Sequence, residues 1–308
     1  MKRTVLCGLC LFLTLSIQAV GRIDSLLAIL KSNDSGYVFV VAHRGDWRHA
    51  PENSISAINN AAAMGVDMVE IDIQKTKDGD FVLMHDGNIN RMTDGTGNIS
   101  DYTVEELKKF RLRFNDGTLS DERIPTLKEA LLACKGKLLV NIDKGGDYLA
   151  DITPIIQETE TENHVILKGR NSVEQVKKQL VGYKDIIYMP IVDLDSDGAI
   201  SYIDSFLSDF HPVAMEVSFK TDDFPQLSYV NNIADAGCRI WINTLWESLC
   251  GGHEDEKAIT QPDANWGWVL KQRATIIQTD RPVELISYLK QKGLREIRSG
   301  IIKYALEE

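Results

Sequence analysis

The sequence predicts an α/β protein of the (β/α)8, or TIM-type, barrel kind, for two reasons. From residue 38 onward, short apolar runs that favour extended structure alternate with segments that favour helix, the pattern of a parallel sheet covered by helices. There are eight such runs, and eight strands close this type of barrel. The predicted strands are residues 38–42, 68–73, 137–142, 164–167, 186–192, 213–217, 238–244 and 275–279.

Residues 1–21 have the pattern of a secretory signal peptide. Lys2 and Arg3 precede an apolar run over residues 5–17, and small residues follow it. The apolar run is too short to cross a bilayer. We therefore expect this segment to be removed, the protein to be periplasmic or secreted, and no stable membrane insertion to remain.

The rest of the chain is expected to form one domain with a helix in front of it. Residues 22–35 predict a short amphipathic helix that packs across the bottom of the barrel. Residues 36–308 have the length and composition of one barrel domain. The net charge of −11 argues against a nucleic acid partner, because binding a polyanion needs a basic surface.

Two acids of the second predicted strand indicate a metal site. Glu70 and Asp72 are two residues apart, so the period of a strand points both carboxylates to the same face. Burying two acids in an otherwise apolar strand is costly unless a cation neutralises them. A metal ion is the simplest such cation.

Two histidines and an arginine stand at the ends of other extended runs. His43 and Arg44 follow the first predicted strand, and His85 follows the run over residues 81–84. Together with the two acids, this set suits phosphodiester cleavage. A divalent cation polarises the phosphoryl oxygens, arginine binds the phosphate through a planar fork, and two imidazoles transfer protons.

The order of these motifs resembles the signature of the glycerophosphodiester phosphodiesterases. The motifs are His43-Arg44-Gly45, Pro51-Glu52-Asn53-Ser54, Glu70-Ile71-Asp72, Lys77-Asp78-Gly79, His85-Asp86 and Arg91-Met92-Thr93 with Gly97. The resemblance covers about residues 37–292. It implies a barrel of the phospholipase-C-like phosphodiesterase kind with a bound Mg²⁺ or Ca²⁺. It also implies hydrolysis of a small-molecule glycerophosphodiester to sn-glycerol 3-phosphate and an alcohol.

The resemblance implies further site residues and an insertion. Glu70 and Asp72 are expected to bind the metal, with Glu52 nearby as a further candidate ligand. A small insertion is expected after the second strand, at about residues 87–125, and it either selects the alcohol or is a structural flap. Trp241 matches the family strand whose tryptophan flanks the substrate. It is expected to pack on the glycerol moiety unless it is a buried core residue.

The third predicted strand departs from the family pattern of a glutamate with a lysine two positions later. Here Asp143 and Lys144 are adjacent, so a regular strand cannot point both inward. We expect Asp143 to be the third metal ligand, as in the related spider sphingomyelinases D, with Asn141 as the competing candidate. Lys168, at the end of the next strand, either replaces the missing phosphate-binding lysine or points into solvent.

Other functions and one structural question stay open from the sequence. The same residues suit a phospholipase D-like cleavage of lysophospholipids through a cyclic phosphate. The shifted Asp143-Lys144 pattern also allows a barrel that has lost catalysis and acts as a binding protein. A phosphoinositide-specific hydrolase is less well matched by the paired acids. After signal removal Cys134, Cys238 and Cys250 remain, which allows one disulfide at most.

Overall fold

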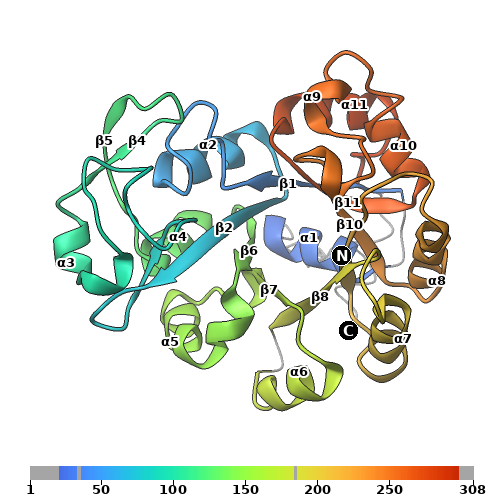
Figure 1. The fold of residues 1–308 in the computed structure, drawn as a ribbon, viewed down its shortest axis with the longest axis horizontal. Helices are drawn as coiled ribbons and strands as arrows, with labels where there is room; N and C mark the ends of the chain where they lie inside the picture. The colour runs from blue at the N-terminus through green and yellow to red at the C-terminus, as the bar shows by residue number, and fades with distance from the viewer. Residues whose placement is uncertain (1–20, 33–35, 184–185, 298–308) are drawn as a thin grey trace, which may run out of the picture.

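The structure is a closed barrel of eight parallel strands (Figure 1). It is a computed structural model that describes residues 21–32, 36–183 and 186–297. β1 pairs with both β2 and β11, which closes the ring. The strands are β1 Phe39–His43, β2 Met68–Lys75, β6 Leu139–Asp143, β7 Val165–Gly169, β8 Ile187–Asp193, β9 Ala214–Ser218, β10 Arg239–Asn243 and β11 Ala274–Thr279. The predicted fold class is confirmed, and the predicted signal peptide lies outside the described residues.

Both faces of each strand carry apolar side chains: one faces the barrel interior and the other faces outward. The outward face is covered by helices. Along β1, Val40 and Ala42 pack outward in the layer shared with the helices, whereas Phe39 and Val41 pack in the barrel interior. The surrounding helices are α2 Ile55–Met64, α4 Leu127–Cys134, α5 Leu149–Thr159, α6 Val173–Gln179, α7 Ala199–Asp209, α8 Val230–Asp235, α10 Trp266–Lys271 and α11 Pro282–Gln291. Within the described ranges, no helix combines the length and apolar character needed to span a membrane.

The limits of α2 follow from its capping residues. Ser54 is the N-cap, and its side chain accepts a hydrogen bond from the backbone of Ala57. Gly65 ends the helix in a left-handed conformation with φ of 84°. Because Ser54 is the N-cap, the side chain of Asn53 is available for another role.

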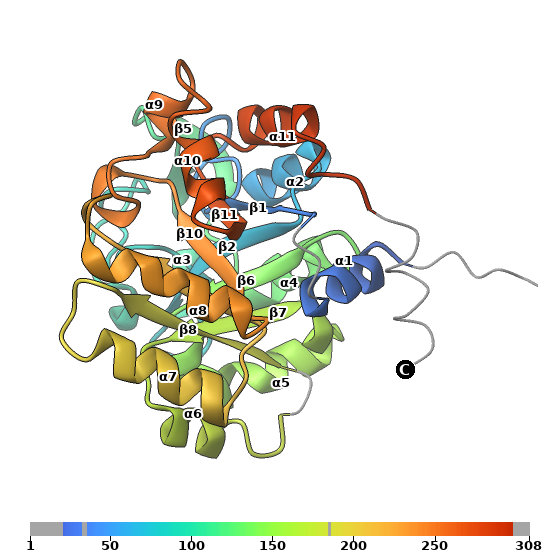
Figure 2. The ribbon, with the colours of Figure 1, turned by 90° about the vertical axis from the view of Figure 1, so that its right-hand side faces the viewer.

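The N-terminal helix α1, Arg22–Lys31, closes the bottom of the barrel (Figure 2). Leu26 and Ile29 pack against inward residues of the strands, as the amphipathic pattern predicted. The Arg239 guanidinium donates hydrogen bonds to the Leu30 carbonyl at 2.9 Å and to the Ile29 carbonyl at 2.6 Å. These contacts fix the end of α1 to β10.

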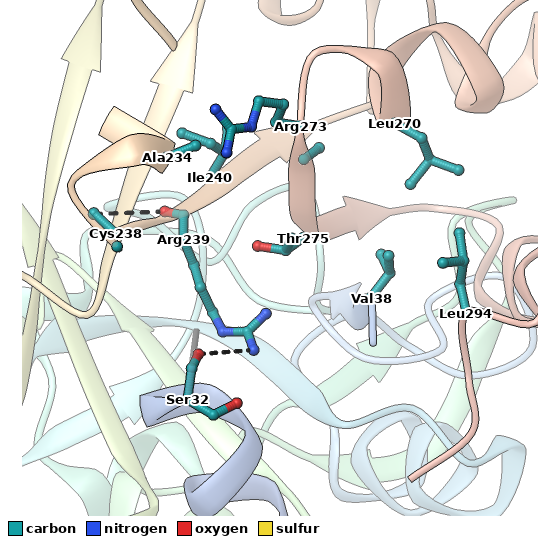
Figure 3. A pocket seen from close by; sticks show the side chains of 12 residues that line it. Ser32, Val38, Ala234, Cys238, Arg239, Ile240, Leu270, Arg273, Thr275 and Leu294 are labelled. Carbon is teal, nitrogen blue, oxygen red and sulfur yellow. Dashed lines mark hydrogen bonds between the residues drawn. The ribbon is translucent and has the colours of Figure 1, made fainter. Parts of the chain in front are cut away.

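A cavity of about 360 Å³ lies beside this end of the barrel. Its lining includes Ser32, Val38, Cys238, Arg239 and Thr275 (Figure 3). Because these residues lie at the C-terminal end of α1 and at or just before the amino ends of β1, β10 and β11, the cavity lies away from the predicted site at the carboxyl ends.

The segment between β2 and α4 forms the expected insertion. β3, Phe81–Leu83, returns antiparallel along the end of β2, so the two strands form a hairpin. The segment then contains α3, Val104–Leu107, and a two-stranded sheet of β4, Arg111–Arg113, and β5, Leu119–Arg123. It has a small apolar cluster of its own that includes Ile89, Ile99 and Leu112. The two-stranded sheet was not predicted from the sequence, because its strands are only three and five residues long.

The question of a disulfide is answered for the described residues. Cys134, Cys238 and Cys250 are all buried and unpaired. Burial raises the pKa of each thiol to about 12, so the three cysteines behave as core residues.

Candidate active site

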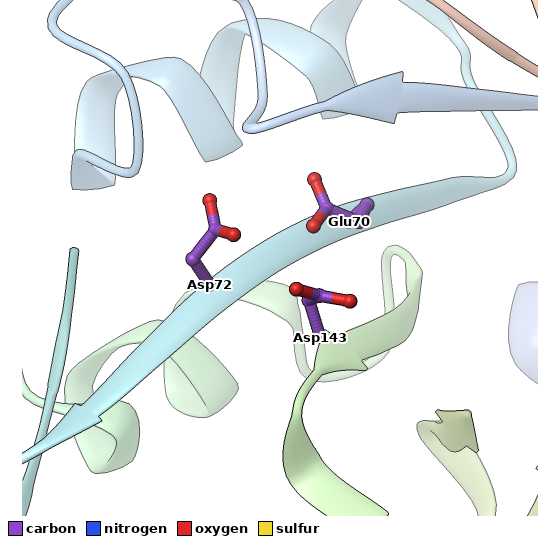
Figure 4. Close-up of side chains that lie close together, drawn as sticks. All are labelled: Glu70, Asp72 and Asp143. Atoms are coloured by element: carbon purple, nitrogen blue, oxygen red, sulfur yellow. The ribbon is translucent and has the colours of Figure 1, made fainter. Parts of the chain in front are cut away.

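Three acids meet at the carboxyl end of the barrel (Figure 4). Glu70 and Asp72 point inward from β2, and Asp143 ends the neighbouring strand β6. The parallel register pairs Asp72 with Asp143, which brings the two side chains to the same level. One oxygen from each carboxylate lies within 4.8 Å of the others. The structure therefore brings together the three acids that the sequence analysis selected as ligands.

The electrostatics of this cluster fit a bound cation. Burial and the neighbouring charge of Asp72 raise the pKa of Glu70 well above its ordinary value. A divalent ion with oxygen ligands relieves this repulsion, since carboxylates are the ligands that Mg²⁺ and Ca²⁺ prefer. The competing candidate Asn141 also faces the interior, beside Glu70. Its buried Oδ1 has no hydrogen-bond partner among the described residues, so Asn141 stays a candidate ligand.

Arg44 reaches into the cluster from a left-handed turn after β1. Arg44 has φ of 53° and Gly45 has φ of 75°. A Cβ at Gly45 would lie 2.7 Å from the backbone of Ala57, so only glycine fits against α2. The turn directs the Arg44 backbone N–H to Glu70 at 3.1 Å and its Nε to within 3.3 Å of Asp72.

Asn53 holds Asp72 in place, a role that the sequence analysis did not assign. Its Nδ2 donates to Asp72 Oδ2 at 2.8 Å, and its Oδ1 accepts from the Asp72 backbone N–H at 3.0 Å. Asn53 adopts φ of 57°, a conformation that asparagine tolerates better than most residues. The motif Pro51-Glu52-Asn53-Ser54 thus caps a helix and orients a candidate ligand.

Glu52 is paired with two arginines and is not a member of the three-acid cluster. Its carboxylate accepts from Arg91 Nη2 at 2.7 Å and from Arg44 Nη1 at 3.2 Å. Although burial opposes it, the hydrogen bonds and charges of Arg91 and Arg44 lower the pKa of Glu52. The expectation that Glu52 is a direct ligand is not supported by this position. It instead orients Arg44.

Lys168 points into the barrel mouth, and not into solvent. Its side chain is 7% exposed, and Nζ lies 3.2 Å from Glu216 and 3.4 Å from Asp143. Although burial opposes it, the charges of Glu216, Asp143 and Glu70 raise the pKa of Lys168, so the ammonium group stays charged. Glu216 is held in turn by Asn243 Nδ2 at 2.9 Å. Lys144 has φ of 61°, which turns the chain away after β6.

His43 forms a hydrogen-bonded pair with Asp280, at the end of β11. Its Nδ1 lies 2.8 Å from Asp280 Oδ1, which also accepts from Trp47 Nε1 at 2.6 Å. The register places His43 beside Glu70 on the other side. Asp280 leaves the Nε2 of His43 free to face the site. Asp280 was not selected from the sequence, because no local pattern shows that β11 closes onto β1.

His85 is paired with its neighbour Asp86 in the same way. Its Nδ1 lies 2.7 Å from Asp86 Oδ1. The hydrogen bond from Arg91 lowers the pKa of Asp86 to about 2, so this carboxylate is ionised at neutral pH. Because Arg91 also binds Glu52, it joins the His85 segment to Arg44 and the acids.

Trp241 does not lie at the mouth. Its side chain is 0% exposed and packs among inward apolar residues beneath the mouth, with Lys168 Nζ 6.0 Å from its ring centroid and Nε1 donating to Asn243 at 2.6 Å. The expectation that Trp241 packs on the substrate is therefore corrected in favour of the core alternative. The exposed tryptophan at the mouth is Trp246, whose ring lies 6.2 Å from His43 and is 46% exposed.

A hollow of about 210 Å³ opens beside His43 and Arg44. Trp47 and Trp246 line it, and Asn115 of the insertion lies at its edge. The turn between β4 and β5 therefore reaches the mouth, as an overhanging segment would. The fold and the site together define a (β/α)8 barrel with a candidate divalent-metal centre at the carboxyl ends of its strands.

Comparisons with known proteins agree with this class. Residues 43–189 match the glycerophosphoryl diester phosphodiesterase family, and residues 188–289 match a domain of unknown function. A glycerophosphodiester phosphodiesterase from Caldanaerobacter subterraneus subsp. tengcongensis is 40% identical over 149 residues, which are 45% of this chain and 61% of that protein. The chain spans about a third to three fifths of the length of the first curated relatives that it matches.

Solved structures show the same fold over most of the chain. A glycerophosphoryl diester phosphodiesterase from Parabacteroides distasonis has a TM-score of 0.71 and 24% identity, and the match covers 88% of this chain and 92% of that one. An Oleispira antarctica phosphodiesterase in complex with the product sn-glycerol-3-phosphate has a TM-score of 0.63 and 21% identity. That match covers 84% of this chain and 99% of the other.

The repulsion within the acid cluster predicts how Glu70→Gln changes the protein. The raised pKa of Glu70 shows that the metal-free fold disfavours the ionised carboxylate. As the pH rises above the ordinary pKa of a glutamate, Glu70 therefore lowers the free energy of unfolding. Without metal at pH 7, the free energy of unfolding of E70Q should therefore be about 1–2 kcal/mol higher than that of the wild type, a usual gain for a stabilising substitution. It should also lose the increase in Tm that Mg²⁺ or Ca²⁺ gives the wild type.

Denaturant unfolding with and without EDTA measures both effects. E284Q, at an exposed acid on α11, is the matched control and should change neither. A destabilised metal-free E70Q, or one that keeps the full metal response, would contradict a shared cation site.

Proposed function

We propose that this protein is a metal-dependent phosphodiesterase that hydrolyses glycerophosphodiesters to sn-glycerol 3-phosphate and an alcohol. The observation that carries the proposal is the three-acid cluster beside Arg44, together with the histidine–aspartate pairs that follow β1 and β3. The relatives named as glycerophosphodiester phosphodiesterases support the same reaction, and so does the Oleispira antarctica structure with its product.

Glu70, Asp72 and Asp143 would hold the cation, either Mg²⁺ or Ca²⁺. When bound, the ion supplies Lewis-acid stabilisation of the negative charge on the phosphoryl oxygens. Arg44 would bind the phosphate through its guanidinium fork, since Glu52 already orients it toward the cluster. Lys168 adds a fixed positive charge on the other side of Asp143. The positive charges of Arg44 and Lys168 would hold the phosphodiester between them.

The two histidines would transfer the protons of the reaction. In each pair the carboxylate faces Nδ1, which favours a proton on Nδ1 and leaves Nε2 as the reactive nitrogen. One imidazole would remove a proton from the attacking hydroxyl as the new P–O bond forms. The other would donate a proton to the alcohol oxygen as the old P–O bond breaks. The attacking hydroxyl belongs to water or to the neighbouring glycerol carbon, in which case a cyclic phosphate forms first.

The hollow between Trp47 and Trp246 provides room for one end of the substrate. It adjoins His43, so a group bound there lies next to a proton-transfer residue. Asn115 places the insertion at the same hollow, which fits a role of this segment in selecting the alcohol.

The reaction is tested with a panel of glycerophosphodiesters that carry choline, ethanolamine, glycerol or inositol. We expect turnover of at least one diester with Mg²⁺ or Ca²⁺ and loss of turnover in EDTA, because the cluster needs a cation. Phosphorus NMR of the products distinguishes the alternatives. A stable cyclic phosphate from lysophospholipids would favour the phospholipase D-like reaction, and binding without turnover would indicate a barrel that has lost catalysis.

The histidine variants His43→Ala and His85→Ala test the roles of the two pairs. Each should lower kcat by about 10²–10⁴-fold, the usual contribution of a general acid or base. The fold should stay intact, since both side chains lie at the mouth and not in the apolar core. His211→Ala, a change in an exposed loop, is the control and should keep wild-type turnover. Near-normal kcat in either site variant, measured on the best diester, would remove that histidine from the mechanism.

We also propose that the chain is exported, to the periplasm or outside the cell, because residues 1–21 have the pattern of a signal peptide. N-terminal sequencing of the protein from an expressing bacterium should find a mature end near residue 22. A chain that keeps Met1 in the cytoplasmic fraction would contradict export.

A further inference from the structure

A buried carboxylate that the proposed reaction does not use lies behind the His43–Asp280 pair. Asp255 belongs to the long loop after β10, at the start of α9, Asp255–Ala258, and is 1% exposed. Burial raises the pKa of Asp255 to about 6. A buried acid is costly, so the contacts of its two oxygens show what it provides to the fold.

The two oxygens of Asp255 have different partners. Oδ1 accepts from the Thr244 hydroxyl at 2.6 Å and from Trp266 Nε1 at 2.9 Å. Oδ2 accepts from the backbone N–H of Asp280 at 2.7 Å. The Thr279 hydroxyl also hydrogen-bonds to this carboxylate. All four donors are neutral. Asp255 therefore connects β10, α10 and the end of β11 without forming an ion pair with any of them.

The contact with Asp280 is the one that reaches the site. Asp280 is the first residue after β11, where the ladder between β1 and β11 has ended at the pair Ala42 and Thr279. Beyond this point its backbone is held from two sides, because its N–H donates to Asp255 and its carbonyl accepts from Arg48 Nε at 2.8 Å. The side chain of Asp280 then binds both His43 and Trp47.

We propose that Asp255 is a positioning residue for catalysis, which fixes the Asp280 backbone so that its carboxylate holds His43 in the reactive orientation. The inference rests on the proposed function only in taking His43 as a proton-transfer residue. Outer partners of this kind usually change activity by about 10–100-fold when they are removed.

The chemistry of Asp255→Asn makes the test selective. Asparagine offers one acceptor oxygen and one NH₂ donor at a place where four donors surround the carboxylate. If its NH₂ faces Asp280, the Asp280 N–H loses its partner. If its NH₂ faces Thr244 and Trp266, it meets the indole N–H, which cannot accept. The control Trp266→Phe removes one donor from the same carboxylate and leaves the bond to Asp280 intact.

The experiment compares the full-length wild type, D255N, W266F and D280N. Histidine is labelled with ¹⁵N, the His43 signals are assigned with His43→Gln, and the tautomer of His43 is read from long-range ¹H–¹⁵N spectra. We expect D280N to lose the Nδ1–H tautomer and D255N to shift toward the D280N spectrum. D255N should also lower kcat by about 10–100-fold with KM within about threefold. W266F should resemble the wild type in both measurements.

The proposal is overturned if D255N keeps the wild-type His43 spectrum, or if W266F changes it as much as D255N does. If D255N does not fold, as monitored by circular dichroism, Asp255→Glu replaces it, because this variant keeps the charge and moves the oxygens by one methylene. Its His43 spectrum should likewise shift toward that of D280N, and a wild-type spectrum would overturn the proposal. Absence of turnover in the wild type would count against the proposed function, whereas the NMR comparison would still test the role of Asp255.

Discussion

Repulsion between buried acids is the constraint on which the mouth of this barrel depends. Glu70, Asp72 and Asp143 lie close together on top of the apolar barrel interior. Their negative charge must therefore be neutralised by groups at the mouth. The protein supplies part of that balance with Arg44 and Lys168. Each of these cations is shared with a further acid, Glu52 or Glu216, so negative charge remains in excess. A divalent cation would neutralise this excess negative charge, and a phosphate would bind to that cation.

The same excess of acids explains how the rest of the site is organised. Arg44, Arg91 and Lys168 are each held by two carboxylates, which restricts their motion before a substrate arrives. Arg91 between Asp86 and Glu52 is an example, since it links the end of the β3 hairpin to the start of α2. Catalytic groups that are fixed in advance need little reorganisation when charge develops in a reaction. The insertion contributes to this rigidity because Arg91 lies at its start.

The second half of the barrel has a definite part in the site, although its sequence matches a domain of unknown function. Glu216 and Asn243 hold Lys168 in the mouth, and Trp246 forms one wall of the hollow. Asp280 reaches His43 because β11 pairs with β1 and closes the ring. Strands 1, 2 and 6 thus carry the acids and the arginine, whereas strands 9 to 11 fix the groups around them.

The sequence by itself determined the strands and the paired acids of β2. These follow from local spacing, because a two-residue period puts Glu70 and Asp72 on one face wherever the strand lies. Only the tertiary structure decided which distant groups meet them. The pairing of His43 with Asp280, the inward position of Lys168 and the burial of Trp241 depend on ring closure and on depth within the barrel, which no local pattern encodes. Asn53 and Asp255 were missed for the same reason, since a hydrogen bond to a residue far along the chain leaves no periodic trace in the sequence.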